Sequence, residues 1–407
     1  MNQPDTAVPT GNAPWTCPFC PLLCDTFGVE AGTPLKLVGG DCPRARKALA
    51  NFDASGGAAQ PQVGGQDCDL DTALGKAASL LAASRQPLFG GLGTDVAGAR
   101  ALYALACETG AICDPAQGAA LMHGLRALQD RGGFSTTLAE ARTRADLIVC
   151  MTEEPAAHYP EFFRRIGVGE REGVAVETLP LHGDLFDTVA MLAALVAGRV
   201  SKDDARVPAD LAALAARLQA ARYAVLVYES GRLPAQGALI IEAIQRIVAT
   251  LNRSTRAASL PLGGGDGAST VNQVFAWLSG LPLRSRAGPL GLEHEPLCFD
   301  AERLLADGAA DTLLWVSSYG PEPAPPAAGM PRIVLGHPGM PLLRDAHELV
   351  FIPVSTPGIG SAGHLFRTDG SVLLPLRPVY DDGLPGVAEV VRRLTQAVQA
   401  LKKGRVQ

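Results

Sequence analysis

Long apolar runs and a basic N-terminus are both missing from this sequence of 407 residues. No stretch reaches the ~18–20 apolar residues that a bilayer-spanning helix needs. The polar segment before Trp15 contains no Lys or Arg, whereas a secretory signal peptide has a basic start followed by an apolar core. We therefore expect a cytoplasmic protein without membrane contact. Its nine cysteines are then expected to be thiols or metal ligands, not disulfides.

The sequence is also poor in aromatic residues and has no excess of positive charge. Phe, Trp and Tyr make up 5% of the residues, and 35 Lys and Arg against 41 Asp and Glu give a net charge of −6. Nucleic-acid binding needs a basic surface and often aromatic stacking platforms, so we expect no nucleic-acid partner. Three common signatures of hydrolases and nucleoside triphosphatases are absent from the sequence: Gly-x-Ser-x-Gly, His-Glu-x-x-His and the Walker loop.

The sequence does contain a repeated pattern of short apolar runs and amphipathic segments. Apolar residues make up 47% of the chain, and continuous apolar runs of strand length suit parallel strands buried on both faces. Such runs are found at residues 87–91, 111–114, 146–151, 222–228, 312–316, 332–335 and 348–352. Residues 96–108, 122–131 and 235–251 have helical periodicity, and Asp95 is expected to cap the first of these helices. The alternation predicts an α/β fold with two doubly wound, nucleotide-fold-like parallel-sheet halves.

Composition divides the chain into five expected parts. Residues 1–14 are expected to form a flexible polar tail, and residues 15–70 a small cysteine-rich lobe with a Gly-rich connecting loop. Residues 71–215 and 216–355 are the two expected α/β domains. Residues 356–407 are expected to pack back on the core.

Four of the nine cysteines lie close together near the N-terminus. Cys17, Cys20, Cys24 and Cys42 have the spacing Cys-x2-Cys-x3-Cys-x17-Cys, and four thiolates can converge on one soft metal centre. A [4Fe–4S] cluster takes one thiolate per iron, and a tetrahedral zinc site also takes four. The uneven spacing differs from the paired arms of a zinc ribbon, so the iron–sulfur cluster is favoured, with zinc and reduced thiols as alternatives. The remaining cysteines are expected to be small buried apolar residues.

The order of these features resembles the molybdopterin and tungstopterin oxidoreductases, and within them the B subunit of formylmethanofuran dehydrogenase. Besides the cysteine motif, the resemblance rests on residues 110–114 (GAICD), 141–149 (ARTRADLIV), 267–280 (GASTVNQVFAWLSG) and 366–370 (FRTDG). It extends over nearly the whole chain. It implies a molybdopterin oxidoreductase-like fold and a place in one-carbon metabolism based on tetrahydromethanopterin and methylofuran.

Two departures from the family pattern bear on function. In redox-active members a Cys directly before a His-Gly pair ligates the metal, whereas here Met122 precedes His123. A neutral thioether is a weak donor and cannot replace a thiolate on molybdenum or tungsten. Glu153 and Glu154 stand where the family has a turn that suits a pterin pyrophosphate, and two carboxylates would repel that group.

This combination resembles the bacterial branch of the family, in which the B subunit is part of a formyltransferase/hydrolase complex. It implies a non-catalytic scaffold that has lost its molybdopterin or tungstopterin, with methylofuran bound at the level of the complex. The implied partners are a formyltransferase subunit, an amidohydrolase-type metallohydrolase subunit and a further small subunit. Two alternatives stay open: an active molybdenum or tungsten dehydrogenase subunit that passes electrons through a [4Fe–4S] cluster, and a zinc-stabilised interaction module.

Three further features have a simple structural interpretation beside a functional one. His123 is either the remnant of a ligand site or a partly buried histidine, and we favour the latter. Residues 263–267 (GGGDG) could hold an anion through backbone N–H groups, but they lack the Gly-x-Gly-x-x-Gly spacing and are expected to form a loop. Arg164, Arg165 and Arg171 are interspersed with acids and are expected to form ion pairs on an exposed face instead of binding an acidic carrier.

Overall fold

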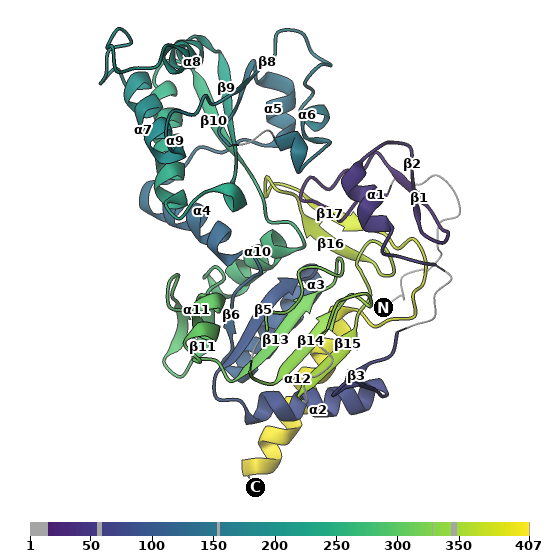
Figure 1. Cartoon of the computed structure of the whole chain (residues 1–407). Coiled ribbons are helices and arrows are strands. Elements are labelled where there is room, and N and C mark those ends of the chain that lie inside the picture. Colours follow the sequence, from purple (N-terminus) through teal and green to yellow (C-terminus); the bar gives the residue numbers. More distant parts are fainter. Residues whose placement is uncertain (1–14, 55–58, 153–154, 328, 343–347, 407) are drawn as a thin grey trace. The chain divides into compact units, whose positions relative to one another are not determined.

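The computed structural model describes residues 15–54, 59–152, 155–327, 329–342 and 348–406 (Figure 1). The expected polar tail and the acidic pair Glu153 and Glu154 lie outside these residues. The described residues form two compact units. Unit 1 comprises the chain up to residue 118, residues 264–367 and the chain from residue 373 onward, and unit 2 comprises residues 119–263 and 368–372.

Unit 1 is built around a mixed sheet with a parallel centre. Its strands are β3 (Gln62–Val63), β4 (Gln66–Asp67), β5 (Pro87–Gly93), β6 (Ile112–Cys113), β11 (Ser285–Gly288), β12 (Gly291–His294), β13 (Thr312–Ser317), β14 (Arg332–Gly336) and β15 (Leu349–Pro353). In the described residues their order is β12-β11-β6-β5-β13-β14-β15-β3-β4. Neighbours from β6 to β15 pair in parallel, and antiparallel hairpins form the two edges. The parallel strands are buried throughout, as their apolar runs predict.

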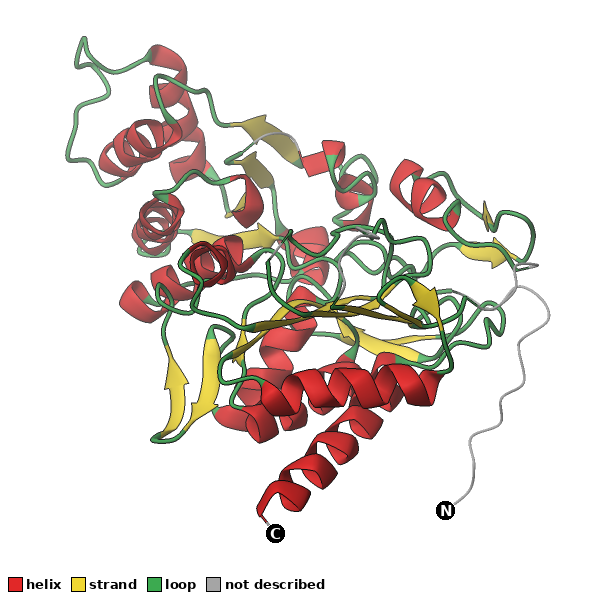
Figure 2. Ribbon diagram, turned by 60° about the horizontal axis from the view of Figure 1, so that its bottom comes forward, coloured by secondary structure: helices red, strands yellow, loops and turns green. Residues whose placement is uncertain are grey.

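Helices cover the sheet of unit 1 (Figure 2). One layer consists of α2 (Leu70–Ala83), α3 (Val96–Thr109), α10 (Ala268–Ser279) and α12 (Val387–Val406), in which α12 contacts both α2 and α3. The short helix α11 (Ala301–Ala306) packs with Phe299 on Trp315 and Phe351 of the sheet. Asp95 caps α3 as predicted, since its side chain accepts a hydrogen bond from Gly98 N at 2.9 Å. No helix in the described part of the chain is long and apolar enough to cross a membrane.

The cysteine-rich lobe and a late hairpin complete unit 1. The lobe holds the antiparallel strands β1 (Gly28–Glu30) and β2 (Lys36–Val38), followed by α1 (Pro43–Leu49). The hairpin is formed by β16 (Gly363–Phe366) and β17 (Leu373–Leu376). The Trp15 indole N–H donates to the Gly358 carbonyl oxygen at 2.7 Å, so the lobe is tied to the segment that precedes this hairpin.

Unit 2 is built around a smaller sheet that is parallel throughout. Its strands β7 (Leu147–Cys150), β8 (Ala175–Thr178), β9 (Tyr223–Glu229) and β10 (Arg256–Leu262) have the order β10-β9-β7-β8 in the described residues. The helices are α4 (Gly118–Arg131), α5 (Leu138–Arg144), α6 (Phe162–Arg165), α7 (Leu185–Val196), α8 (Ala209–Ala220) and α9 (Gly237–Leu251), with short 3-10 turns at Pro155–Ala157 and Ser230–Arg232. The apolar stripe of α9 is buried against α7 and the sheet. The predicted α/β class with two parallel sheets is confirmed.

The two sheets do not follow consecutive halves of the chain. The boundaries expected from the sequence separate residues 71–215 from 216–355, whereas β5 and β6 share a sheet with β13, β14 and β15. The chain leaves unit 1 after residue 118 and returns at residue 264. Local periodicity cannot reveal that the chain leaves unit 1 and later returns to it. Strands that follow one another in the sequence are usually, but not always, neighbours in a sheet. The helix expected at residues 122–131 also begins earlier, at Gly118.

Glycines in β5 allow its close pairing with β13. A Cβ atom on Gly90 would lie 2.9 Å from Cε3 of Trp315. Gly91 has a φ of 72°, and a Cβ atom there would lie 2.6 Å from the Val316 carbonyl oxygen. Both positions therefore need glycine, because any side chain would push the two strands apart.

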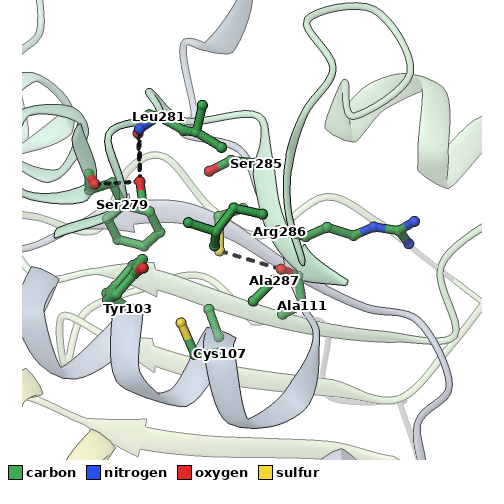
Figure 3. A pocket seen from close by; sticks show the side chains of 12 residues that line it. Tyr103, Cys107, Ala111, Ser279, Leu281, Ser285, Arg286 and Ala287 are labelled. Carbon is green, nitrogen blue, oxygen red and sulfur yellow. Dashed lines mark hydrogen bonds between the residues drawn. The ribbon is translucent and has the colours of Figure 1, made fainter. Parts of the chain in front are cut away.

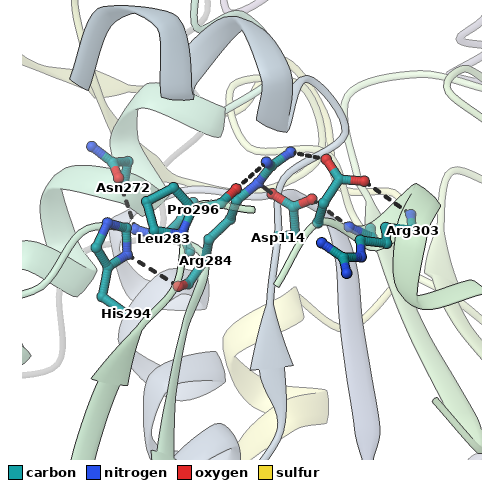
Figure 4. A network of polar contacts seen from close by, with 9 residues as sticks. Asp114, Asn272, Leu283, Arg284, His294, Pro296 and Arg303 are labelled. Carbon is teal, nitrogen blue, oxygen red and sulfur yellow. Dashed lines mark hydrogen bonds and ion pairs between the residues drawn. The ribbon is translucent and has the colours of Figure 1, made fainter. Parts of the chain in front are cut away.

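A buried arginine connects the end of β6 to the β11–β12 hairpin and α11 (Figure 4). Arg284 is 4% exposed, and its Nε donates to Asp114 Oδ1 at 3.0 Å. The guanidinium also donates to Asp300 and to the Pro296 carbonyl oxygen. Asp114 Oδ2 accepts from Ala301 N at 2.8 Å. Burial raises the pKa of Asp114 to about 6, and the Arg284 charge opposes this shift. Removing either partner of this pair would leave the other as an unpaired buried polar group, which lowers the free energy of unfolding.

We expect Arg284→Met to lower the free energy of unfolding by about 3–5 kcal/mol, the usual cost of removing one partner of a buried ion pair. Arg303→Met is the matched control, because it removes an exposed contact of 3.5 Å with Asp307 and should cost less than about 1 kcal/mol. Urea unfolding followed by circular dichroism measures both losses. Equal losses would contradict the role given to Arg284.

Candidate functional site

Each parallel sheet has a point at which successive strands are added in opposite directions. In unit 1 this point lies between β5, which is followed by β6 on one side, and β13, which is followed by β14 on the other. In unit 2 it lies between β7 and β9. Ligands of open α/β sheets bind at such points, outside the carboxyl ends of the strands. Functional side chains are therefore expected at these two sets of strand ends.

A pocket of about 420 Å³ lies at the strand ends of unit 1. Its walls include Gly93 at the end of β5 and Ser317 at the end of β13. The segment before α10 contributes Gly265 and Asp266, and α10 itself contributes Ala268. The ionisable groups of the lining are the carboxylates of Asp266 and Glu322. We call this cavity the strand-end pocket; its volume suits a small-molecule ligand.

The glycine-rich segment 263–267 is a loop in the structure, as expected, and it leads directly into α10. Gly264, Asp266 and Gly267 have φ values of 73°, 52° and 81°. A Cβ atom on Gly267 would lie 2.2 Å from the Thr94 carbonyl oxygen. Only glycine at position 267 therefore lets the turn approach the end of β5 this closely. Left-handed backbone is uncommon at non-glycine residues, and aspartate is one of the residues that adopt it more often.

Asp266 lies close to one positive and one neutral polar group. Burial raises the pKa of Asp266, and the nearby Arg44 guanidinium lowers it. The charges of Asp95 and Asp266 in turn raise the pKa of Tyr319, after the larger effect of burial. The sequence alone does not identify Asp266 as a pocket residue, because an acidic residue between glycines is also common in exposed loops.

The strand ends of unit 2 hold a buried acid as well. Glu229 ends β9, is 4% exposed, and its Oε2 lies 3.2 Å from His158 Nδ1. The Arg232 guanidinium contacts His158 Nε2, so the histidine lies between Arg232 and Glu229. Glu229 N donates to Thr152 Oγ1 at 3.3 Å, which links the ends of β9 and β7. The sequence gives one weak signal of this group, a Glu directly after a long apolar run.

The four cysteines of the lobe are all buried. Cys17 N donates to the Cys24 carbonyl oxygen at 2.8 Å, and Leu23 N donates to that of Cys20 at 3.1 Å, which closes a tight turn. Burial raises the pKa of Cys17, and the charges of Cys20, Cys24 and Cys42 raise it further, so the four thiols lie within electrostatic reach of one another. In the described residues, however, no group of three or more His, Cys, Asp or Glu side chains is arranged to hold a metal ion.

The lobe packs on the sheet through a series of ring contacts. Trp15 contacts Phe19 and Phe19 contacts Phe52, with ring centroids 6.2 Å and 5.8 Å apart. Phe52 meets His337, just after β14, edge to face at 4.9 Å. His337 is 3% exposed and its Nδ1 accepts from Gly339 N at 3.0 Å. Burial lowers the pKa of His337 to about 4, so a neutral histidine belongs to this interface.

Met122 and His123 lie in α4 of unit 2. Met122 is 4% exposed, and His123 is half-buried with its ring against Gly237, where a Cβ atom would lie 2.6 Å from Cδ2. The favoured interpretation of His123, a partly buried histidine, agrees with this position. Of the arginines expected on an ion-paired face, Arg164 pairs with Glu161, and Arg171 donates to the Thr143 carbonyl oxygen.

A second pocket, between α3, α10 and β11, is too small for a ligand (Figure 3). Its volume of about 10 Å³ is barely enough for one water molecule. Tyr103, Cys107 and Cys113 belong to its lining. Cys113 is buried, but Cys107 and Cys298 are exposed, so the expectation that all the single cysteines are buried is wrong for these two.

The comparisons with known proteins decide the family. No protein-family model matches the chain. The B subunit of the formyltransferase/hydrolase complex Fhc from Methylorubrum extorquens is 33% identical over 331 residues, which cover 76% of this chain and 89% of the relative. The chain belongs to this B-subunit family. The B subunit of the tungsten-containing formylmethanofuran dehydrogenase 2 from Methanocaldococcus jannaschii is 28% identical, over 95% of this chain and 98% of its own length.

A solved structure agrees with this assignment. A chain of the formyltransferase/hydrolase complex FhcABCD from Methylorubrum extorquens, in complex with methylofuran, matches with a TM-score of 0.74 and 31% identity. The match covers 85% of this chain and 99% of that chain. The resemblance inferred from the sequence and the fold that it implied are therefore confirmed.

We expect the neutral state of His337 to make the protein less stable in acid. The unfolded chain binds this proton near pH 6.5, whereas the folded protein binds it only near pH 4, so stability falls as the pH falls from 6.5 to 4, by up to about 3 kcal/mol. His337→Asn keeps an acceptor for Gly339 N and should flatten this part of the profile. The measurement is urea unfolding across that pH range. His364→Asn, at an exposed histidine, is the control, and an unchanged slope in His337→Asn would contradict the assignment.

Proposed function

We propose that this chain is a non-catalytic B subunit of a formyltransferase/hydrolase complex and that it holds no molybdenum or tungsten pterin. The observation on which this rests is the pair of carboxylates, Asp266 and Glu322, that are the ionisable groups among the described lining residues of the strand-end pocket. Family resemblance implies a pterin pyrophosphate in redox-active members, and a pyrophosphate needs donors and positive charge. Carboxylates at these places repel it instead.

Met122 supports the same proposal. A thioether is neutral and a weak donor to a high-valent metal, and Met122 is 4% exposed within a helix. Its side chain therefore fits an apolar packing role. The residues present therefore do not fit a metal pterin.

The partners follow from the relatives. The relatives are subunits of assemblies that bear the names formyltransferase/hydrolase complex and formylmethanofuran dehydrogenase. We propose that this chain assembles with a formyltransferase subunit, an amidohydrolase-type metallohydrolase subunit and a further small subunit. Methylofuran, present in the solved relative's structure, would be bound at the level of that complex.

We further propose that Cys17, Cys20, Cys24 and Cys42 hold a [4Fe–4S] cluster with a structural role. Four thiols match the four irons of the cluster in number. All four cysteines are buried, and a bound metal would compensate the charge of thiolates at such a place. Zinc in the same site is the alternative.

The composition of the native complex tests the main proposal. We expect anaerobically purified complex to contain the formyltransferase and metallohydrolase subunits, and less than about 0.1 molybdenum, tungsten or pterin per copy of this chain. Metal analysis by mass spectrometry and pterin fluorescence measure this. Stoichiometric molybdenum or tungsten with pterin would instead establish the redox-active alternative.

The cysteine site has its own test in the same preparation. We expect about four iron and four sulfide per chain and a visible absorption band. Cys42→Ser should lose both the iron and the absorption and lower the melting temperature. Cys298→Ser, at an exposed cysteine, is the matched control. One zinc without a visible band would support the zinc alternative, and neither metal would refute both.

A further inference from the structure

We propose that the strand-end pocket binds a small organic cation, a ligand that carries an ammonium group on a short alkyl or ring portion. The carboxylates of Asp266 and Glu322 would hold the ammonium group, and the apolar part of the wall would hold the remainder. This inference goes beyond the proposed function, which concerns only what the pocket excludes. Four observations on unit 1 support it.

The first observation is the charge of the pocket wall. The two ionisable side chains among the described lining residues are both acids, and they come from different segments of the chain. Asp266 lies in the loop before α10, and Glu322 lies in the loop after β13. Glu322 Oε2 accepts a hydrogen bond from Ala324 N at 2.9 Å, which restrains this side chain. A positively charged ligand is therefore attracted by both segments, and no basic side chain of the described lining repels it.

The second observation is that the Asp266 side chain has no bonded partner. Among the described residues it makes no hydrogen bond and no ion pair, although it is partly buried. Arg44 of the lobe lies near this loop, since its Nη2 is 3.8 Å from the position that a Cβ atom on Gly265 would take. Its Nε, however, donates to the Phe19 carbonyl oxygen at 2.8 Å, and Arg44 is not part of the pocket lining. A partly buried carboxylate without a donor is costly, so an ammonium N–H group beside Asp266 would be stabilised.

The third observation is a buried hydroxyl group at the end of β13. Ser317 is 2% exposed and belongs to the pocket lining. Its hydroxyl makes no hydrogen bond to any residue that the structure describes, whereas the hydroxyl of the neighbouring Ser318 donates to the Gly93 carbonyl oxygen at 2.8 Å. A hydroxyl oxygen accepts hydrogen bonds, and buried polar groups are normally bonded. A ligand N–H group in the pocket would therefore supply the partner that Ser317 lacks.

The fourth observation favours an organic cation over a metal ion. No group of three or more His, Cys, Asp or Glu side chains in the described residues is arranged to hold a metal. The volume of about 420 Å³ suits a small molecule, and a bare ion would fill only a small part of it. Ala116, Ala268 and Val316 provide apolar wall, against which an alkyl or ring portion can pack.

The test measures binding of cyclohexylamine to the full chain in its purified complex, by isothermal titration calorimetry near neutral pH, where the amine is protonated. Cyclohexanol has nearly the same shape without the charge. We expect a dissociation constant of about 1 mM or below for the amine, and binding at least about tenfold weaker for the alcohol. Asp266→Asn and Glu322→Gln should each weaken amine binding by about tenfold and leave the alcohol unaffected. Asp307→Asn removes an exposed acid at the C-terminus of α11 and should change neither.

Four outcomes would overturn the inference: no binding of the amine, equal binding of amine and alcohol, undiminished amine binding in the folded pocket variants, or the same loss in Asp307→Asn. Circular dichroism and the melting temperature establish folding, and Glu322→Gln, at an exposed residue, decides the result if Asp266→Asn does not fold. The pterin analysis is separate. Pterin in the native complex would refute the proposed function, whereas failure of amine binding with no pterin present would refute only this inference.

Discussion

The pairing of β5 with β13 is the interaction on which unit 1 depends. It requires glycine at two positions of β5, because Trp315 and the Val316 carbonyl oxygen occupy the space that side chains would need. Both ends of the pair are fixed by hydrogen bonds. Asp311 accepts from Arg85 N at 2.7 Å before the strands, and the Ser318 hydroxyl donates to the Gly93 carbonyl oxygen at 2.8 Å after them. Gly93, which accepts this second bond, also lines the strand-end pocket, so the pocket lies at the end of the β5–β13 pair.

The family's framework and its chemistry can be separated in this chain. Parallel strands, the loop before α10 and the cysteine lobe are all present, and each is held by contacts of its own within the unit to which it belongs. Under the proposed function, the groups that would engage an anionic cofactor are replaced by carboxylates at the strand ends and by a thioether in α4. Such replacements change the charge of a site without disturbing the apolar packing that stabilises the sheets.

The sequence predicts the local structure well and the long-range pairing poorly. The apolar runs of β5, β7, β9 and β13 to β15, and the cap at Asp95, follow from residue type and spacing, because burial on both faces and capping are local requirements. The insertion of unit 2 between residues 118 and 264 has no local signature, since it depends on which strands meet. The candidate site was predictable only in part. The four lobe cysteines are evident from their spacing, and Met122 is evident from the resemblance. The surroundings of Asp266 and the contact of Glu229 with His158 depend on distant segments that the fold brings together. His158 and Glu229, for example, are 71 residues apart in the sequence.

The position of unit 2 within the chain also affects how the protein is made. Strand β5 ends at Gly93 and its partner β13 begins at Thr312, so a ribosome working at ~5–20 residues per second leaves β5 without that partner for ~10–40 s. Residues 119–263 of unit 2 emerge within that interval and can bury their own core. The apolar strands β5 and β6 of unit 1 therefore wait for β13 while the larger part of unit 2 is made.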